Sequence, residues 1–117
     1  MNFLDKMGMK AALGRLQKSG LAPSNATAID YETAATPGST AGSGLFLITN
    51  EALYFGLHDS LTGHHRIEFS DIGETKVERS GISATYSLYR RDGQLLVELY
   101  VRSARTSFIE RFQALGK

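Results

Sequence analysis

The clearest pattern of apolar and polar positions lies between residues 44 and 57, where two apolar runs flank a short polar corner. Residues 45–48 form the first run, Thr49-Asn50-Glu51 form the corner, and residues 52–57 form the second run. Runs of this length that are joined by turn-forming residues are typical of buried antiparallel strands. We therefore expect a hairpin with strands at 45–50 and 52–58.

Further strands are predicted on both sides of this hairpin, where apolar residues alternate with polar ones. A first strand is expected over 26–34, with Ile29 and Tyr31 on one side and Asp30 and Glu32 on the other. The remaining expected strands cover residues 65–72, 74–79, 82–90 and 94–102. The last two are the most regular, because a tight Asp-Gly turn joins two segments that keep a period of two.

Residues 3–19 are rich in helix-forming residues and follow Asn2, a good N-cap. The apolar side chains of this predicted helix fall on two nearly opposite faces. The first stripe is Phe3, Leu4, Met7 and Ala11, and the second is Met9, Leu13 and Leu16. Two stripes fit a helix with two neighbours, which we expect to be the chain's own barrel and a second subunit.

A shorter helix is predicted near residue 117, with an apolar face made of Phe108, Ile109, Phe112 and Leu115. Ser107 and Glu110 have the spacing of a capping box, and Ser103 is an alternative N-cap one turn earlier. Two Phe side chains on a short helix are most easily buried at the open end of a β-barrel, at on the order of 2–3 kcal/mol each. The expected fold is therefore mainly β (α+β): a seven-stranded antiparallel barrel or sandwich capped by a C-terminal helix, with an extra N-terminal helix.

Length and composition indicate one globular unit, since the chain has 117 residues. We expect an N-terminal helix and linker over 1–22 and the β domain over 23–117. The chain has no Cys, no run approaching a membrane span and no signal-peptide pattern, which favours a cytoplasmic protein. A net charge of +1 and a pI near 8.0 argue against a nucleic-acid partner.

Candidate chemistry is sparse, and we expect no enzyme activity and no cofactor. His58 and His64 flank a predicted polar loop and are weak candidates for a metal site, but their spacing matches no strong metal motif. An exposed polar loop explains them equally well. A His-Asp-Ser triad from the same loop lacks a nucleophile turn and an oxyanion site. The carboxylates are scattered along the chain, and no pair stands out for acid–base catalysis.

The sequence resembles the pleckstrin-homology superfold, and more closely the bacterial pleckstrin-homology-like and GRAM-like domains, including the YokE-like group. The pattern Gly-apolar-apolar-apolar-Thr-Asn-x-x-Leu-apolar-Phe stands here at residues 44–55, and an apolar-x-apolar-x-Asp-Ile step at 67–72. The resemblance implies a barrel that binds a partner or a lipid. This chain has Glu51 and Ala52 where the family commonly has a basic residue, and residues 35–44 carry no Lys or Arg. Both departures argue against tight phosphoinositide binding.

These features indicate two alternative functions. The first is a protein-interaction or assembly module, self-associating as a homo-oligomer. The residues expected in that interface are Phe3, Leu4, Met7, Leu13, Leu16, Tyr89 and Tyr100. The two Tyr residues fall on the solvent face of the last hairpin, and could equally stabilise it as a cross-strand pair. The alternative is peripheral contact with an anionic membrane through the basic residues of the first helix, which are Lys6, Lys10, Arg15 and Lys18.

Overall fold

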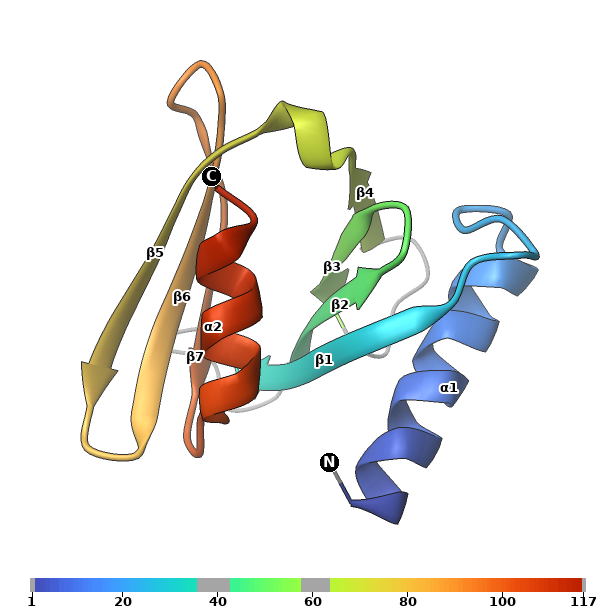
Figure 1. Cartoon of the computed structure of the whole chain (residues 1–117), viewed down its shortest axis with the longest axis horizontal. Helices are drawn as coiled ribbons and strands as arrows, with labels where there is room; N and C mark the ends of the chain where they lie inside the picture. Colours follow the sequence, from blue (N-terminus) through green and yellow to red (C-terminus); the bar gives the residue numbers. More distant parts are fainter. Residues whose placement is uncertain (1, 36–42, 58–63, 117) are drawn as a thin grey trace.

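The computed structural model describes residues 2–35, 43–57 and 64–116. In these three segments, two α-helices and seven strands follow one another (Figure 1). They are α1 (Phe3–Lys18), β1 (Ala28–Ala35), β2 (Ser43–Thr49), β3 (Leu53–Leu57), β4 (His64–Ile67), β5 (Ile72–Ser80), β6 (Ser83–Arg90), β7 (Leu95–Val101) and α2 (Thr106–Ala114). A short 3-10 turn, η2 (Phe69–Asp71), connects β4 to β5.

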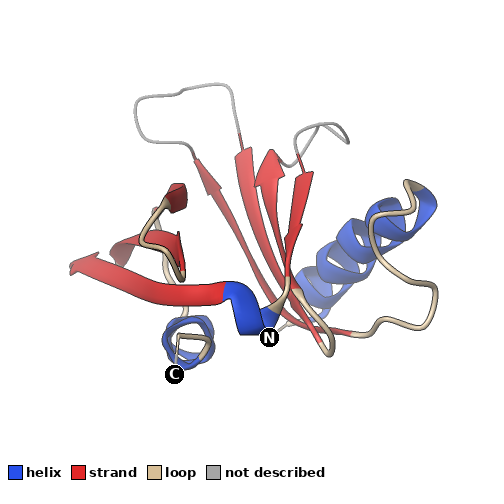
Figure 2. Ribbon diagram, turned by 90° about the horizontal axis from the view of Figure 1, so that it is seen from above, coloured by secondary structure: helices blue, strands red, loops and turns tan. Residues whose placement is uncertain are grey.

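The seven strands form one antiparallel sheet in the order β4-β3-β2-β1-β7-β6-β5. Among the described residues, β1 and β7 meet through one register pair, Ala35 and Tyr100, and the sheet bends there into a four-stranded half and a three-stranded half. α1 and α2 lie on opposite sides of the four-stranded half (Figure 2). This architecture confirms the expected mainly-β (α+β) fold, with seven antiparallel strands, a C-terminal helix and an added N-terminal one.

The main core lies between the two halves of the sheet and is closed by α2. Four aromatic side chains meet there and are fully buried: Phe46, Tyr86, Phe108 and Phe112. The ring centroid of Phe112 lies 5.1 Å from that of Phe46 and 5.1 Å from that of Tyr86. The apolar face of α2 therefore plugs the barrel, as its sequence predicts.

A second core lies on the other face of the four-stranded half, under α1. The apolar stripe Met9, Leu13 and Leu16 packs there against Leu47 and Tyr54 of the hairpin. Because one helix covers each face, residues 45–48 are all buried instead of alternating. This double burial explains the continuous apolar run in the sequence.

The polar corner between β2 and β3 is held by its own side chains. The hydroxyl of Thr49 donates a 2.8 Å hydrogen bond to the carbonyl of Ala52 and accepts one of 3.1 Å from the same residue's amide. The side-chain oxygen of Asn50 accepts a 2.8 Å hydrogen bond from the amide of Thr27. The structural role expected for Thr49 and Asn50 is confirmed.

Of the two N-caps predicted from the sequence, that of α1 is confirmed and that of α2 is not. The side chain of Asn2 caps α1 by accepting a hydrogen bond of 2.8 Å from the Asp5 amide. The predicted capping box of α2 is wrong, because its N-cap is Arg105 and no side chain caps it in the Ser/Thr manner. The backbone amide of Arg105 instead donates a 3.3 Å hydrogen bond to the carboxylate of Glu32, which lies in β1.

Several strand positions also differ from expectation. The predicted strand 65–72 ends at Ile67, and η2 follows because Asp71 N bonds back to the carbonyl of Glu68. Ile82 and Leu95 begin the apolar alternation of the predicted strands 82–90 and 94–102, a pattern that places them on the core side, but they are 72% and 47% exposed. Ile82 lies in the turn before β6, and a register shift near the β6–β7 turn moves Leu95 outward.

Candidate functional site

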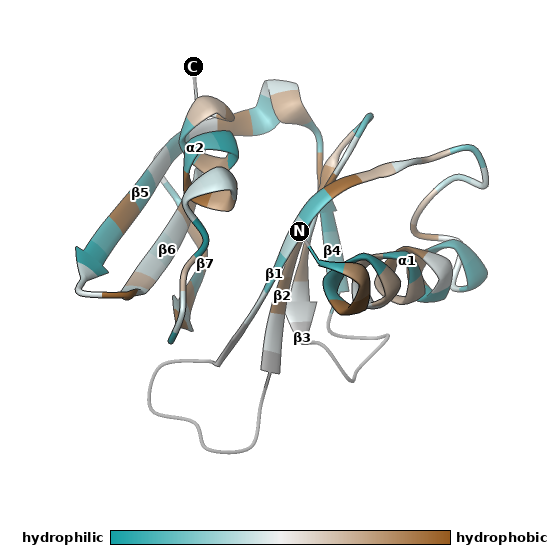
Figure 3. Ribbon diagram, turned by 60° about the horizontal axis from the view of Figure 1, so that its bottom comes forward, coloured by the Kyte–Doolittle hydropathy of each residue, from teal (hydrophilic) through white to brown (hydrophobic). Residues whose placement is uncertain are grey.

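The surface of α1 that faces away from the sheet is apolar. Phe3, Leu4 and Met7 are 74%, 75% and 53% exposed, and Ala11 continues the same stripe. Figure 3 shows apolar positions concentrated in the first turns of this helix. Large exposed side chains that share one face of a helix are a feature of contact surfaces.

Basic side chains border this apolar stripe, and all four are exposed: Lys6, Lys10, Arg15 and Lys18. The single acidic residue of α1, Asp5, lies toward Tyr31, and its charge contributes to raising the pKa of the Tyr31 hydroxyl after burial does. Four basic residues and one acidic residue give the helix a net charge of +3. We call the stripe and its basic border the outer face of α1.

Two residues expected at a partner interface lie inside the chain instead. Leu13 and Leu16 are 8% and 1% exposed, because their stripe packs against β2 and β3. The expectation that the helix contacts its own barrel is thereby confirmed, whereas these two side chains are not accessible to a partner. Phe3, Leu4 and Met7 remain accessible.

The two Tyr residues of the last hairpin do not form the expected cross-strand pair. Tyr89 is opposite Leu95, and Tyr100 is opposite Thr85. Tyr100 is 37% exposed, and Tyr89 is half-buried with the ammonium of Lys76 5.3 Å from its ring centre. Their place in an interface stays a prediction.

The histidine loop lies largely outside the described residues, and His58 is among those not described. His64 begins β4 and is buried at 8% exposure. Within residues 2–35, 43–57 and 64–116, no three His, Asp or Glu side chains gather closely enough to hold a metal ion. The same residues contain no helix of the length and apolar character needed to cross a membrane.

A buried ionic cluster, not foreseen from the sequence, joins β1 to the start of α2. Asp30 and Glu32 are 2% and 6% exposed. The guanidinium of Arg105 lies 2.8 Å from Asp30 Oδ1 and 3.5 Å from Glu32 Oε1, and it also donates to the carbonyl of Tyr31. The hydroxyl of Tyr86 donates a 3.2 Å hydrogen bond to Glu32. Both carboxylates are therefore paired with the guanidinium of Arg105 within the fold.

The buried environment of Glu32 raises the pKa of its carboxyl group. The hydrogen bonds and charge of Arg105 offset the rise in part. Burial likewise raises the pKa of the Tyr86 hydroxyl, with the neighbouring Glu32 charge adding to the effect. The polar members are positioned by contacts within the core, which is the arrangement of a structural ion-pair cluster rather than of an open catalytic site.

We expect this shift to make stability depend on pH through Glu32. The folded pKa lies above the unfolded value of 4.5, so the contribution of Glu32 to the free energy of unfolding is fully present below that value and is lost as the pH rises through the folded pKa. Glu32→Gln removes this titration. Urea unfolding at about pH 4 and at about pH 7 measures the effect. Between the lower and the higher pH, the free energy of unfolding of the wild type should fall relative to that of the variant. Parallel changes in the two proteins would contradict the assignment.

Alternation in the sequence correctly places Asp30 and Glu32 on one side of β1, yet the buried side is the polar one. Ile29 is 41% exposed, and Tyr31 is directed at α1, where its hydroxyl lies close to Gly8. Both sides of β1 are covered by helices, so the polarity of a residue does not identify the core side there. The signal that could have been used is the pair of acidic residues two positions apart, which are the only charged residues between positions 19 and 50.

No family model matches the sequence, and no curated protein matches it. Among solved structures, the chain is similar to the hSac2 domain from the human phosphoinositide phosphatase Sac2, with 12% sequence identity and a TM-score of 0.47. The superposition covers 99% of this chain and 78% of that chain. At this level of identity the similarity carries no information about ligand or activity.

Proposed function

We propose that this chain is a non-catalytic binding module that docks reversibly onto anionic membrane surfaces through the outer face of α1. One observation carries the proposal: Phe3, Leu4 and Met7 are each more than half exposed, and the side chains that border them are basic. An apolar stripe with a basic border is the arrangement that lies in the interface of an anionic bilayer. The opposite stripe of α1 remains in the core, so docking requires no unfolding.

The expected strength of this contact is modest. Each basic residue near an anionic leaflet contributes roughly 1 kcal/mol, so the four on the outer face would contribute roughly 4 kcal/mol together. Partial insertion of three apolar side chains adds to this. The electrostatic share implies that binding weakens steeply with salt, because exposed charges are screened beyond about 10 Å at 0.1 M salt.

Self-association through the same face is the competing function. Two copies of α1 packed along their apolar stripes would bring Lys6, Lys10, Arg15 and Lys18 of one copy near those of the other. Each helix carries a net charge of +3, so the pairing opposes like charges, whereas an anionic lipid surface complements them. This difference favours the membrane over a second copy.

The double substitution Lys6→Gln and Lys10→Gln tests the proposal. Loss of roughly 2 kcal/mol of attraction should weaken partition onto vesicles of phosphatidylserine and phosphatidylcholine by about 30-fold. A matched control, Arg79→Gln with Arg102→Gln, removes the same charge from exposed positions away from α1. Co-sedimentation at low salt measures both. Equal loss in the two variants would show a non-specific charge effect and contradict the proposal.

Light scattering on a sizing column separates the competing functions. If the outer face of α1 binds membranes, the protein without lipid should have a mass near that of the 12.8 kDa monomer. A discrete oligomer that dissociates when Phe3 and Leu4 are replaced by Ser would assign the outer face of α1 to self-association instead.

A further inference from the structure

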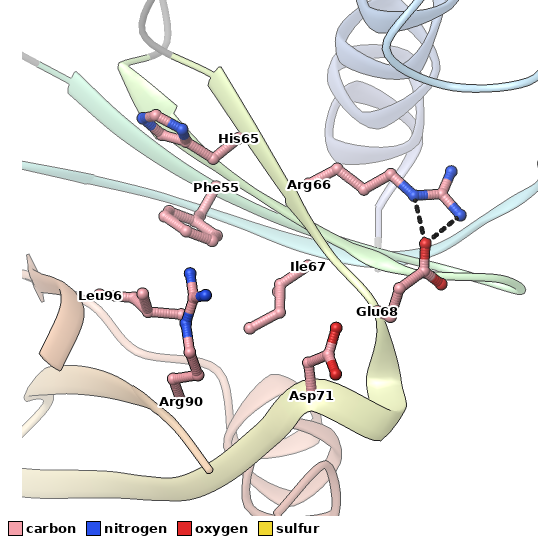
Figure 4. Close-up of a pocket in the computed structure, with 8 residues that line it drawn as sticks. All are labelled: Phe55, His65, Arg66, Ile67, Glu68, Asp71, Arg90 and Leu96. Atoms are coloured by element: carbon pink, nitrogen blue, oxygen red, sulfur yellow. Dashed lines mark hydrogen bonds and ion pairs between the residues drawn. The ribbon is translucent and has the colours of Figure 1, made fainter. Parts of the chain in front are cut away.

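A pocket of about 450 Å³ opens at the seam where the sheet does not close. β4 and β5 are the two ends of the strand order, and η2 spans the gap between them. The pocket is lined by Phe55, His65, Arg66, Ile67, Glu68, Asp71, Arg90 and Leu96 (Figure 4). It lies apart from the outer face of α1, and none of its lining residues belongs to that face.

The floor of the pocket is apolar. Phe55, Ile67 and Leu96 come from β3, β4 and β7, and they approach one another from the two halves of the sheet (Figure 4). The ring of His65 packs 5.4 Å from that of Phe55 and extends this surface. Such a floor can receive one apolar side chain of a ligand.

The charges around the floor are of two kinds. Arg66 is already neutralised, since its guanidinium lies 2.6 Å from Glu51 and 2.8 Å from Glu68. By contrast, the side chains of Arg90 and Asp71 have no ion-pair or hydrogen-bond partner among the described residues. In Figure 4 they lie on opposite sides of Ile67. The pocket therefore offers one cation and one anion to a ligand.

The backbone beside the pocket is the edge of the sheet. β4 is four residues long and pairs with β3 through its register from His64 to Ile67. Within the described part of the chain, no strand lies along its other side. An edge of this kind is a template for a further strand.

We propose that an extended peptide segment adds to the free edge of β4 and places an apolar side chain in the pocket, with a neighbouring acidic residue on Arg90. A peptide can supply all three groups that this site would bind. Its backbone can hydrogen-bond to the edge of β4, an apolar side chain can pack on the floor of the pocket, and a carboxylate can pair with the guanidinium of Arg90. The lining holds two arginines and two carboxylates and is neutral in sum, which disfavours a small free anion such as phosphate. This site is independent of the membrane contact proposed above.

Selection from a library of random seven-residue peptides displayed on phage tests the proposal. We expect enriched sequences with an apolar residue and an acidic residue at a fixed spacing. For the synthetic peptide, Arg90→Gln should weaken binding by about 10- to 100-fold, because a charge-assisted hydrogen bond is lost. The exposed Arg102→Gln is the matched control and should leave binding unchanged.

Two further measurements distinguish strand addition from other modes. Bound peptide should slow hydrogen exchange at amides of β4, and N-methylation of alternate peptide residues should abolish binding. The proposal is overturned if no sequence is enriched, if Arg90→Gln binds as the wild type does, or if protection appears away from β4. Peptides that lose binding through Lys6→Gln and Lys10→Gln would instead occupy the outer face of α1, which also overturns it.

Discussion

Replacing Arg105 by Met is expected to lower the free energy of unfolding by about 3–5 kcal/mol. The substitution leaves Asp30 and Glu32 buried at 2% and 6% exposure without their principal cation. Arg111, whose guanidinium lies 3.5 Å from Asp30, compensates only part of this loss because its side chain is 54% exposed. Urea unfolding followed by circular dichroism measures the change.

Arg102→Met provides the control, since this side chain is exposed at the end of the β7 segment. It should change the stability by less than about 0.5 kcal/mol. Adding Asp30→Asn and Glu32→Gln to Arg105→Met should recover part of the loss, because the uncompensated charges are then gone. Equal stability of Arg105→Met and the wild type would show that the cluster does not hold α2 to β1.

Phe112→Ala is expected to cost about 3–5 kcal/mol, because it opens a cavity where α2 closes the main core. Phe112 is fully buried and lies 5.9 Å, between ring centres, from Phe108 on the same helix. The matched substitution Phe3→Ala removes the same side chain from a position that is 74% exposed, and should leave stability nearly unchanged. Thermal unfolding of both variants checks the pair. Similar melting temperatures for the two would contradict the docking of α2 in the core.

The sequence predicts the elements that obey one simple rule along their whole length. The β6–β7 hairpin alternates regularly except at the register shift near its turn, and it has an Asp-Gly turn, in which Gly93 takes a φ of 91° and Asp92 accepts a hydrogen bond from the Gln94 amide. The apolar face of α2 and the two apolar stripes of α1 are predicted correctly because their apolar residues keep a helical spacing. Boundaries shift where tertiary contacts decide them, as at the start of α2, where the N-cap is Arg105, whose amide donates to Glu32, and not the expected serine.

The candidate site is predicted only in part. Residue periodicity identifies Phe3, Leu4 and Met7 as one stripe, but it cannot tell which of two opposite apolar stripes is buried. The choice depends on the shape of the sheet surface, which receives Met9, Leu13 and Leu16. The pocket at β4 could not be foreseen, because its lining residues come from separate segments that only the bent sheet brings together. Assignment to bacterial GRAM-like domains stays a prediction from the pattern in residues 44–55.

Fluorescence of a single Trp on the outer face of α1 tests whether this face enters a membrane. The chain contains no Trp, so Phe3→Trp introduces a single fluorophore on this face. With vesicles containing phosphatidylserine, we expect its emission to shift to shorter wavelength and to be quenched by brominated acyl chains, while pure phosphatidylcholine vesicles give little change. Tyr100→Trp, on the other side of the fold, should report neither effect. An emission spectrum of the Phe3→Trp protein that is unchanged by anionic vesicles at low salt would contradict the account.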